Sequence, residues 1–60
     1  MNKPDPDQLL TPREAAKFLD LPTQTIRDMI KRKELLAFKV GGQWRIRESE
    51  LTKWAQRHRA

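Results

Sequence analysis

The run Thr11-Pro12-Arg13-Glu14 marks the start of a helix more sharply than any other stretch of this chain marks a structure. The hydroxyl of Thr11 can cap the helix, Pro12 suits its first position, and the carboxylate of Glu14 can reach back to the N–H of Thr11. Apolar residues then recur at helical spacing. The pattern predicts a first helix over residues 12–19.

The triplet Asp20-Leu21-Pro22 interrupts this pattern, because proline cannot continue the hydrogen bonds of the preceding helix. Thr23 follows at the position of a second N-cap, and apolar residues recur at helical spacing over residues 26–30. We expect a second helix from Gln24 to Arg32 or Lys33. Two helices joined by so short a turn form the unit in which the second helix can enter a DNA groove.

Residues 37–47 alternate between apolar and polar side chains around Gly41-Gly42, which predicts a β-hairpin. A two-residue glycine loop would pair Lys39 with Trp44 and mix charge with apolar surface on both faces. We expect instead a three-residue loop over residues 41–43, because it separates apolar from basic side chains. The expected pairs are Val40 with Trp44 and Phe38 with Ile46, with Lys39, Arg45 and Arg47 in a row on the opposite face.

Residues 48–57 return to helical spacing, with acidic residues at the start and basic residues at the end, as the helix dipole favours. The predicted fold class is therefore mainly α with a small β-hairpin. It is a winged helix-turn-helix, in the order helix, turn, helix, two-stranded antiparallel wing, helix. We expect residues 1–8 to be a flexible N-terminal tail and residues 9–58 to be the domain, with all four aromatic side chains in a thin core.

Thirteen Lys and Arg residues against eight Asp and Glu give the 60-residue chain a formal charge of +5, which should attract a polyanion. Cysteine is absent and there is one histidine. We therefore expect no catalytic residues, no metal site and no cofactor, and the chain is not expected to be an enzyme. No apolar run approaches the ~20 residues of a membrane span. The N-terminal residues lack the layout of a signal peptide, so we expect a cytoplasmic protein and no membrane partner.

The polar face of the second predicted helix carries the donors and acceptors that read base edges in a major groove. Arginine pairs with guanine, glutamine with adenine, and aspartate accepts from cytosine. A solvated helix face is the ordinary alternative. The position of this face in a helix-turn-helix of a basic chain favours DNA reading. The residues are Gln24, Arg27, Asp28 and Lys31, flanked by Thr25 and Arg32.

The hairpin supplies the second candidate surface, a basic row beside a glycine tip that lets a backbone approach closely. Charges on an edge strand also discourage aggregation, and the glycines also serve the turn itself. Three basic residues in register fit a phosphate or minor-groove contact better. Binding of single-stranded nucleic acid is a further alternative, which requires Trp44 to be exposed.

A resemblance to a known family is carried by four runs: Leu10–Leu19, Thr23–Arg27, Lys39–Ile46 and Leu51–Trp54. Together they resemble the excisionase-type DNA-binding domains related to MerR winged helices, over about residues 9–57. The resemblance implies that the second helix enters the major groove and that the wing touches the neighbouring backbone or minor groove. By position it assigns Thr23, Gln24, Thr25, Arg27, Asp28 and Lys31 to the groove and Lys39, Gly42, Gln43 and Arg45 to the wing. The chain departs from the family at Lys33, where glycine is common, at Leu36 and Arg47, where proline is frequent, and at Gln43, where arginine is frequent.

These observations predict a sequence-specific double-stranded DNA-binding protein of the nucleoid, acting as a recombination directionality factor or a small transcription regulator. The alternative is a protein-interaction module on a winged-helix scaffold. Further partners to consider are other copies of the chain bound side by side on DNA, and a recombinase or another protein. The expected phosphate contacts come from Lys17, Arg27, Lys39, Arg45 and Arg47.

Overall fold

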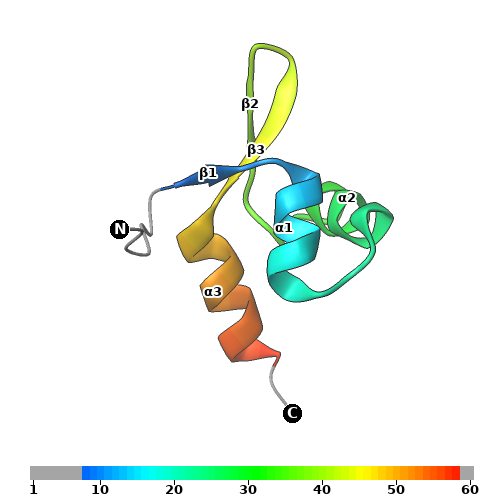
Figure 1. Ribbon diagram of the computed structural model, residues 1–60, viewed down its shortest axis with the longest axis vertical. Helices are drawn as coiled ribbons and strands as arrows, with labels where there is room; N and C mark the ends of the chain where they lie inside the picture. Colours follow the sequence, from blue (N-terminus) through cyan, green and yellow to red (C-terminus); the bar gives the residue numbers. More distant parts are fainter. Residues whose placement is uncertain (1–7, 59–60) are drawn as a thin grey trace.

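Within residues 8–58, which the computed structural model describes, three helices surround one end of a small antiparallel sheet (Figure 1). The predicted fold class, a winged helix-turn-helix, is confirmed. The predicted N-terminal tail lies outside the described residues except for Gln8, and the domain limits remain predictions. The elements are β1 (Leu9–Leu10), α1 (Pro12–Leu19), α2 (Thr23–Lys31), β2 (Phe38–Val40), β3 (Gln43–Arg47) and α3 (Glu48–Arg57).

Helix α1 has the bounds that its capping pattern predicts. The N–H of Glu14 donates to the hydroxyl of Thr11 at 3.1 Å, and the N–H of Thr11 donates to the Glu14 carboxylate at 2.9 Å. The helix ends on Asp20, whose φ of 59° is left-handed, and the N–H of Leu21 donates to the carbonyl of Ala16 at 2.9 Å. With its C-terminus hydrogen-bonded in this way, α1 leads directly into the turn before the next helix.

Helix α2 begins one residue earlier than expected, so the prediction of Thr23 as its N-cap is wrong. Pro22 holds the cap position in an extended conformation and has no side chain that could accept a hydrogen bond. Its carbonyl accepts the N–H groups of Thr25 at 3.0 Å and Ile26 at 3.3 Å. Thr23 is therefore the first helical residue.

The far end of α2 depends on Lys33, which has a left-handed φ of 66°. The N–H of Lys33 donates to the carbonyl of Ile30 at 3.1 Å, and that of Glu34 donates to the carbonyl of Met29 at 2.8 Å. These are the two bonds of a Schellman motif, which normally has glycine at the left-handed position. The helix consequently stops at Lys31, short of the predicted end.

The hairpin has the register that the sequence analysis rejected. The observed partners are Phe38 with Arg45, Lys39 with Trp44 and Val40 with Gln43, so the loop has two residues. Gly41 and Gly42 have φ values of 60° and 82°. A two-residue loop of this kind requires positive φ at both central residues, and two consecutive glycines meet that requirement.

The predicted basic row across the wing is therefore wrong as well. Cross-strand partners share a face, so Lys39 lies with Trp44, while Arg45 lies on the opposite face with Phe38. The guanidinium of Arg47 lies 5.9 Å from the centre of the Phe38 ring. The register thus divides both the basic and the apolar residues of the wing between its two faces.

A third strand, β1, was not predicted. Leu9 pairs with Arg47 and Leu10 with Ile46, which gives the sheet the order β1-β3-β2. The N–H of Glu48 donates to the carbonyl of Gln8 at 2.9 Å, so the pairing continues into the start of α3. The segment before α1 is therefore attached to the wing.

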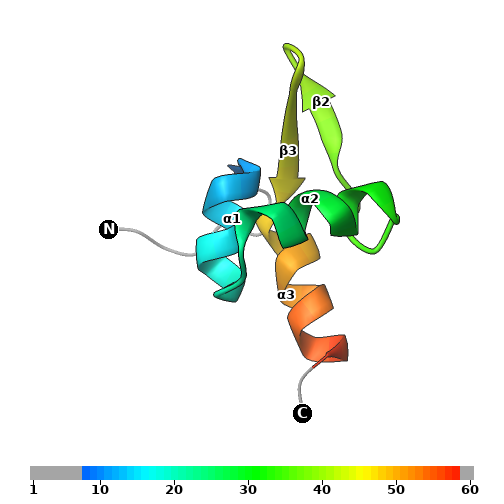
Figure 2. The same cartoon turned by 90° about the vertical axis from the view of Figure 1, so that its right-hand side faces the viewer.

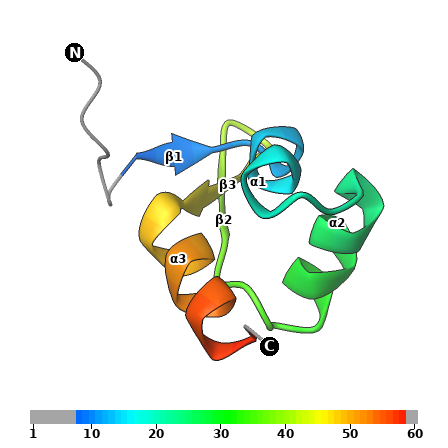
Figure 3. The same cartoon turned by 60° about the horizontal axis from the view of Figure 1, so that its bottom comes forward.

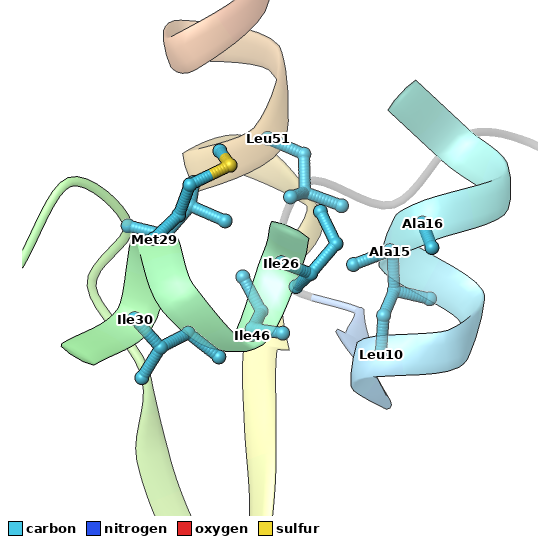
Figure 4. Close-up of a cluster of buried hydrophobic side chains, with 9 residues drawn as sticks. Leu10, Ala15, Ala16, Ile26, Met29, Ile30, Ile46 and Leu51 are labelled. Atoms are coloured by element: carbon cyan, nitrogen blue, oxygen red, sulfur yellow. The ribbon is translucent and has the colours of Figure 1, made fainter. Parts of the chain in front are cut away.

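The core lies where the three helices meet the base of β3 (Figures 3 and 4). The expectation that all four aromatic residues fill it is wrong, because Phe18 is 45% exposed and Phe38 is 40% exposed. Aliphatic side chains fill most of the core, and Trp44 and Trp54 pack against its edge. The buried residues of this hydrophobic core are Leu10, Ala15, Ala16, Ile26, Met29, Ile30, Leu35, Ile46 and Leu51.

Replacing Lys33 by glycine should stabilise the protein by roughly 0.5–1 kcal/mol, because a residue with a Cβ carries a conformational cost at a left-handed position. Lys33→Ala is the matched control, since it removes the same charge and keeps the Cβ. The free energy of unfolding from urea titrations compares the three proteins. Equal stability of the glycine and alanine variants would contradict the assignment.

Replacing Gly41 by alanine should cost about 1 kcal/mol of unfolding free energy, although an added Cβ would meet no atom within 4 Å. The cost comes from the positive φ alone. Gly41→Asn should cost less, because asparagine tolerates this conformation and favours two-residue hairpin loops. Thermal unfolding of both variants is the measurement, and an alanine variant as stable as the wild type would argue against the two-residue loop.

Candidate nucleic-acid interface

The outer surface of α2 carries the polar residues that the sequence analysis selected. Ile26, Met29 and Ile30 are buried, so the helix must direct its remaining side chains outward. The side-chain amide of Gln24 donates to the carboxylate of Asp28 at 3.2 Å, one turn further along the helix. Of the six predicted groove residues, Gln24, Arg27 and Lys31 are exposed, and Thr23, Thr25 and Asp28 are half-buried.

The guanidinium of Arg45 is held in place on the wing by two hydrogen bonds. It donates to the carbonyl of Trp44 at 3.0 Å and to the side-chain oxygen of Gln43 at 3.1 Å. Trp44 is half-buried against the core, with the ammonium group of Lys39 5.1 Å from its ring centre. An indole ring in this position is a poor stacking platform, which disfavours the single-stranded alternative.

An open cleft of about 350 Å³ joins α2 to the wing. We call it the arginine cleft, because arginines from α1, α2 and β3 are among its lining residues. In the view of Figure 2 the wing extends away from the helices next to α2, in agreement with a cleft that both elements line. The lining residues are Thr11, Pro12, Arg13, Arg27, Gly42, Gln43, Trp44 and Arg45.

The cleft brings together predicted residues from both candidate surfaces. Arg27 comes from the helix, and Gly42, Gln43 and Arg45 come from the wing. Residues of α2 and of the wing therefore border one cleft. The nucleic-acid contacts themselves remain predictions.

Two other predicted basic residues line separate hollows. Arg47 lies beside Leu36 and Phe38 in a hollow of about 170 Å³ at the base of the wing. Lys17 lies in a hollow of about 480 Å³ next to the turn between α1 and α2, which it shares with Arg13. Lys39 lines neither these hollows nor the cleft.

Sequence reasoning missed Arg13, which lines both the arginine cleft and the hollow beside the turn. A signal for it exists, because Arg13 and Lys17 are four residues apart and so lie on the same side of α1. The chosen residues came from the second helix and the wing. The contribution of α1 becomes visible only when the packing of α1 against β3 is known.

In the part of the chain that the structure describes, no acidic residue lines the arginine cleft. The only ion pair within residues 8–58 joins Arg32 to Glu34 at 3.5 Å, beyond the end of α2. In the same part of the chain, no group of three His, Asp or Glu side chains is placed to hold a metal ion. None of the described helices has both the length and the apolar character needed to cross a membrane.

A family model described as a helix-turn-helix domain matches residues 9–59. Comparisons with curated proteins and with solved structures give no match. The matched range includes every helix and strand of the fold, with α1 and α2 as the helix-turn-helix pair. The chain therefore belongs to the helix-turn-helix domain family.

Proposed function

We propose that this protein binds double-stranded DNA sequence-specifically, as an excisionase-type, MerR-like winged helix. The observation that carries the proposal is the arginine cleft, whose lining unites Arg27 of α2 with Arg45 of the wing. A helix in a major groove and a wing on the adjacent backbone need basic groups at this junction. The family match over residues 9–59 supports the same function.

Two kinds of contact follow from this proposal. Residues on the outer face of α2 read base edges, and basic residues around it position the protein on the phosphates. The groove-facing set is Thr23, Gln24, Thr25, Arg27, Asp28 and Lys31, of which Arg27 is also one of the expected phosphate contacts. The backbone set is Lys17, Lys39, Gly42, Gln43, Arg45 and Arg47.

The proposed cellular role is that of a recombination directionality factor or a small transcription regulator, working at the nucleoid in the cytoplasm. Both roles are supported by the resemblance to excisionase-type domains. Copies bound side by side on DNA would raise the affinity for an extended site. A recombinase or another DNA-bound protein is the further partner that the first role requires.

Duplexes selected from a random pool should share one sequence and bind more tightly than a scrambled duplex. If about four phosphates are neutralised, the logarithm of the binding constant should fall with the logarithm of salt at a slope of about −3.6. Fluorescence anisotropy of labelled duplexes at several salt concentrations gives this slope. Lys39→Ala should weaken binding to the selected and scrambled duplexes alike. Absence of binding, or binding that salt leaves unchanged, would reject the proposal.

The hydrogen bond between Gln24 and Asp28 makes a more specific expectation possible. A glutamine that uses one amide hydrogen for Asp28 keeps its other hydrogen and its oxygen, which are the pair that adenine N7 and N6 require. We propose that Gln24 reads an adenine and that Asp28 orients it.

Gln24→Ala should therefore abolish the preference for one A·T pair, at a cost of about 1–3 kcal/mol in discrimination. Asp28→Asn should weaken that preference in part, and it should have no further effect once Gln24 is alanine. A double-mutant cycle measured on duplexes with A·T or G·C at the affected position tests this coupling. Additive effects of the two substitutions would mean that Asp28 reads a base independently.

A second candidate function, protein interaction, is favoured by the apolar residues on the outer face of the sheet. Leu9, Phe38 and Val40 are 42%, 40% and 47% exposed, and by register they share the face opposite Leu10 and Ile46. An antiparallel sheet normally presents polar side chains on its solvent face. A stable protein complex together with no affinity for any duplex would favour this function over DNA binding.

A further inference from the structure

Arg13, Arg27 and Arg45 line one cleft, although they come from three elements that are distant in sequence. Arg13 is the second residue of α1, Arg27 is near the middle of α2, and Arg45 is the central residue of β3. Each element is fixed by the core beneath it. The fold therefore brings three arginine residues to one cleft.

Within the described residues, no carboxylate in the cleft balances the charges of these three arginines. Glu14 and Asp28, the carboxylates next in sequence to Arg13 and Arg27, are not among the lining residues, and they accept hydrogen bonds from the N–H of Thr11 and the amide of Gln24. Among residues 8–58, no acidic residue is part of the lining. Three arginines beside one open cleft give it an excess of positive charge, which attracts an anion.

The remaining donors suit a phosphate. Arg45 uses two of its five N–H groups on Trp44 and Gln43, which hold its guanidinium in place and leave other N–H groups free. Guanidinium groups bind phosphate oxygens with paired, charge-assisted hydrogen bonds. Gly42, which has no side chain, also lines the cleft and leaves room for a nucleic-acid backbone.

We propose that the arginine cleft binds a single phosphate of the DNA backbone, with Arg13 as a ligand beside Arg27 and Arg45. This inference rests on the proposed DNA-binding function. It assigns Arg27 to the backbone and leaves base reading to the rest of α2. A phosphate held between helix and wing would set the register of the protein along the duplex.

Arg13→Ala should weaken binding about tenfold to the selected and scrambled duplexes alike, because a charge-assisted contact to the backbone is lost. Arg57→Ala is the matched control. It removes the same charge from the last turn of α3, at the end of the molecule opposite the wing tip (Figure 1), and should change binding little. Arg13→Lys, which keeps the charge without the fork, should fall between the two. Thermal unfolding checks that each variant is folded.

Duplexes that carry one neutral methylphosphonate at successive positions then locate the contact. With the methylphosphonate at one particular position, Arg13→Ala should cause no further loss of affinity. Arg45→Ala should cause no further loss at that same position. Arg27→Ala should lose affinity without losing discrimination between selected and scrambled duplexes.

Three results would overturn the inference: Arg13→Ala binds like Arg57→Ala, Arg13 and Arg45 respond to different phosphates, or Arg27→Ala loses sequence preference. Any of these leaves the proposed function intact if the wild-type protein binds its selected duplex. Absence of wild-type binding to every duplex overturns the proposed function and this inference together.

Discussion

The hydrophobic core that α2 shares with α1 and the base of β3 determines where the rest of the molecule lies, because α2 packs on α1 and α1 packs on β3. Ile26 and Ile46 are both fully buried in the same core. Arg27 follows Ile26 and Arg45 precedes Ile46, and both arginines line the cleft. Burying Ile26 turns Arg27 outward, and burying Ile46 fixes the strand on which Arg45 stands. The free energy of apolar burial thereby positions the charged groups, which could not assemble by mutual attraction.

The helices could be predicted from the sequence because their signals are local. Thr11, Pro12 and Glu14 determine the start of α1 through groups within four residues, and α3 has the predicted bounds for the same kind of reason. The N-cap of α2 was predicted wrongly. The side chain of Thr23 can cap a helix, which favoured Thr23 as the N-cap, but Pro22 occupies the cap position. The error amounts to one residue and leaves the outward face of α2 unchanged.

The wing could be predicted only in outline. Its register was chosen on the assumption that a hairpin keeps its apolar residues on one face, whereas Phe38 and Val40 face solvent and Trp44 and Ile46 face the core. The backbone preference of two adjacent glycines outweighed that assumption. Strand β1 was missed because two residues carry no periodicity, and its pairing depends on partners that lie 36 and 38 residues further along the chain. Arg13 was missed for a related reason, since its neighbours in the cleft come from other elements.

The two ends of the wing are under opposite constraints. At its base, Ile46 is enclosed by Leu10 and the core, so a change there disturbs the whole domain (Figure 4). At its tip, a Cβ on either glycine would have open space around it. The tip is therefore constrained by its positive φ values and not by packing, so residues that tolerate this conformation can replace the glycines without a clash. Within that constraint, the group that the wing presents at its far end can change while the core stays the same.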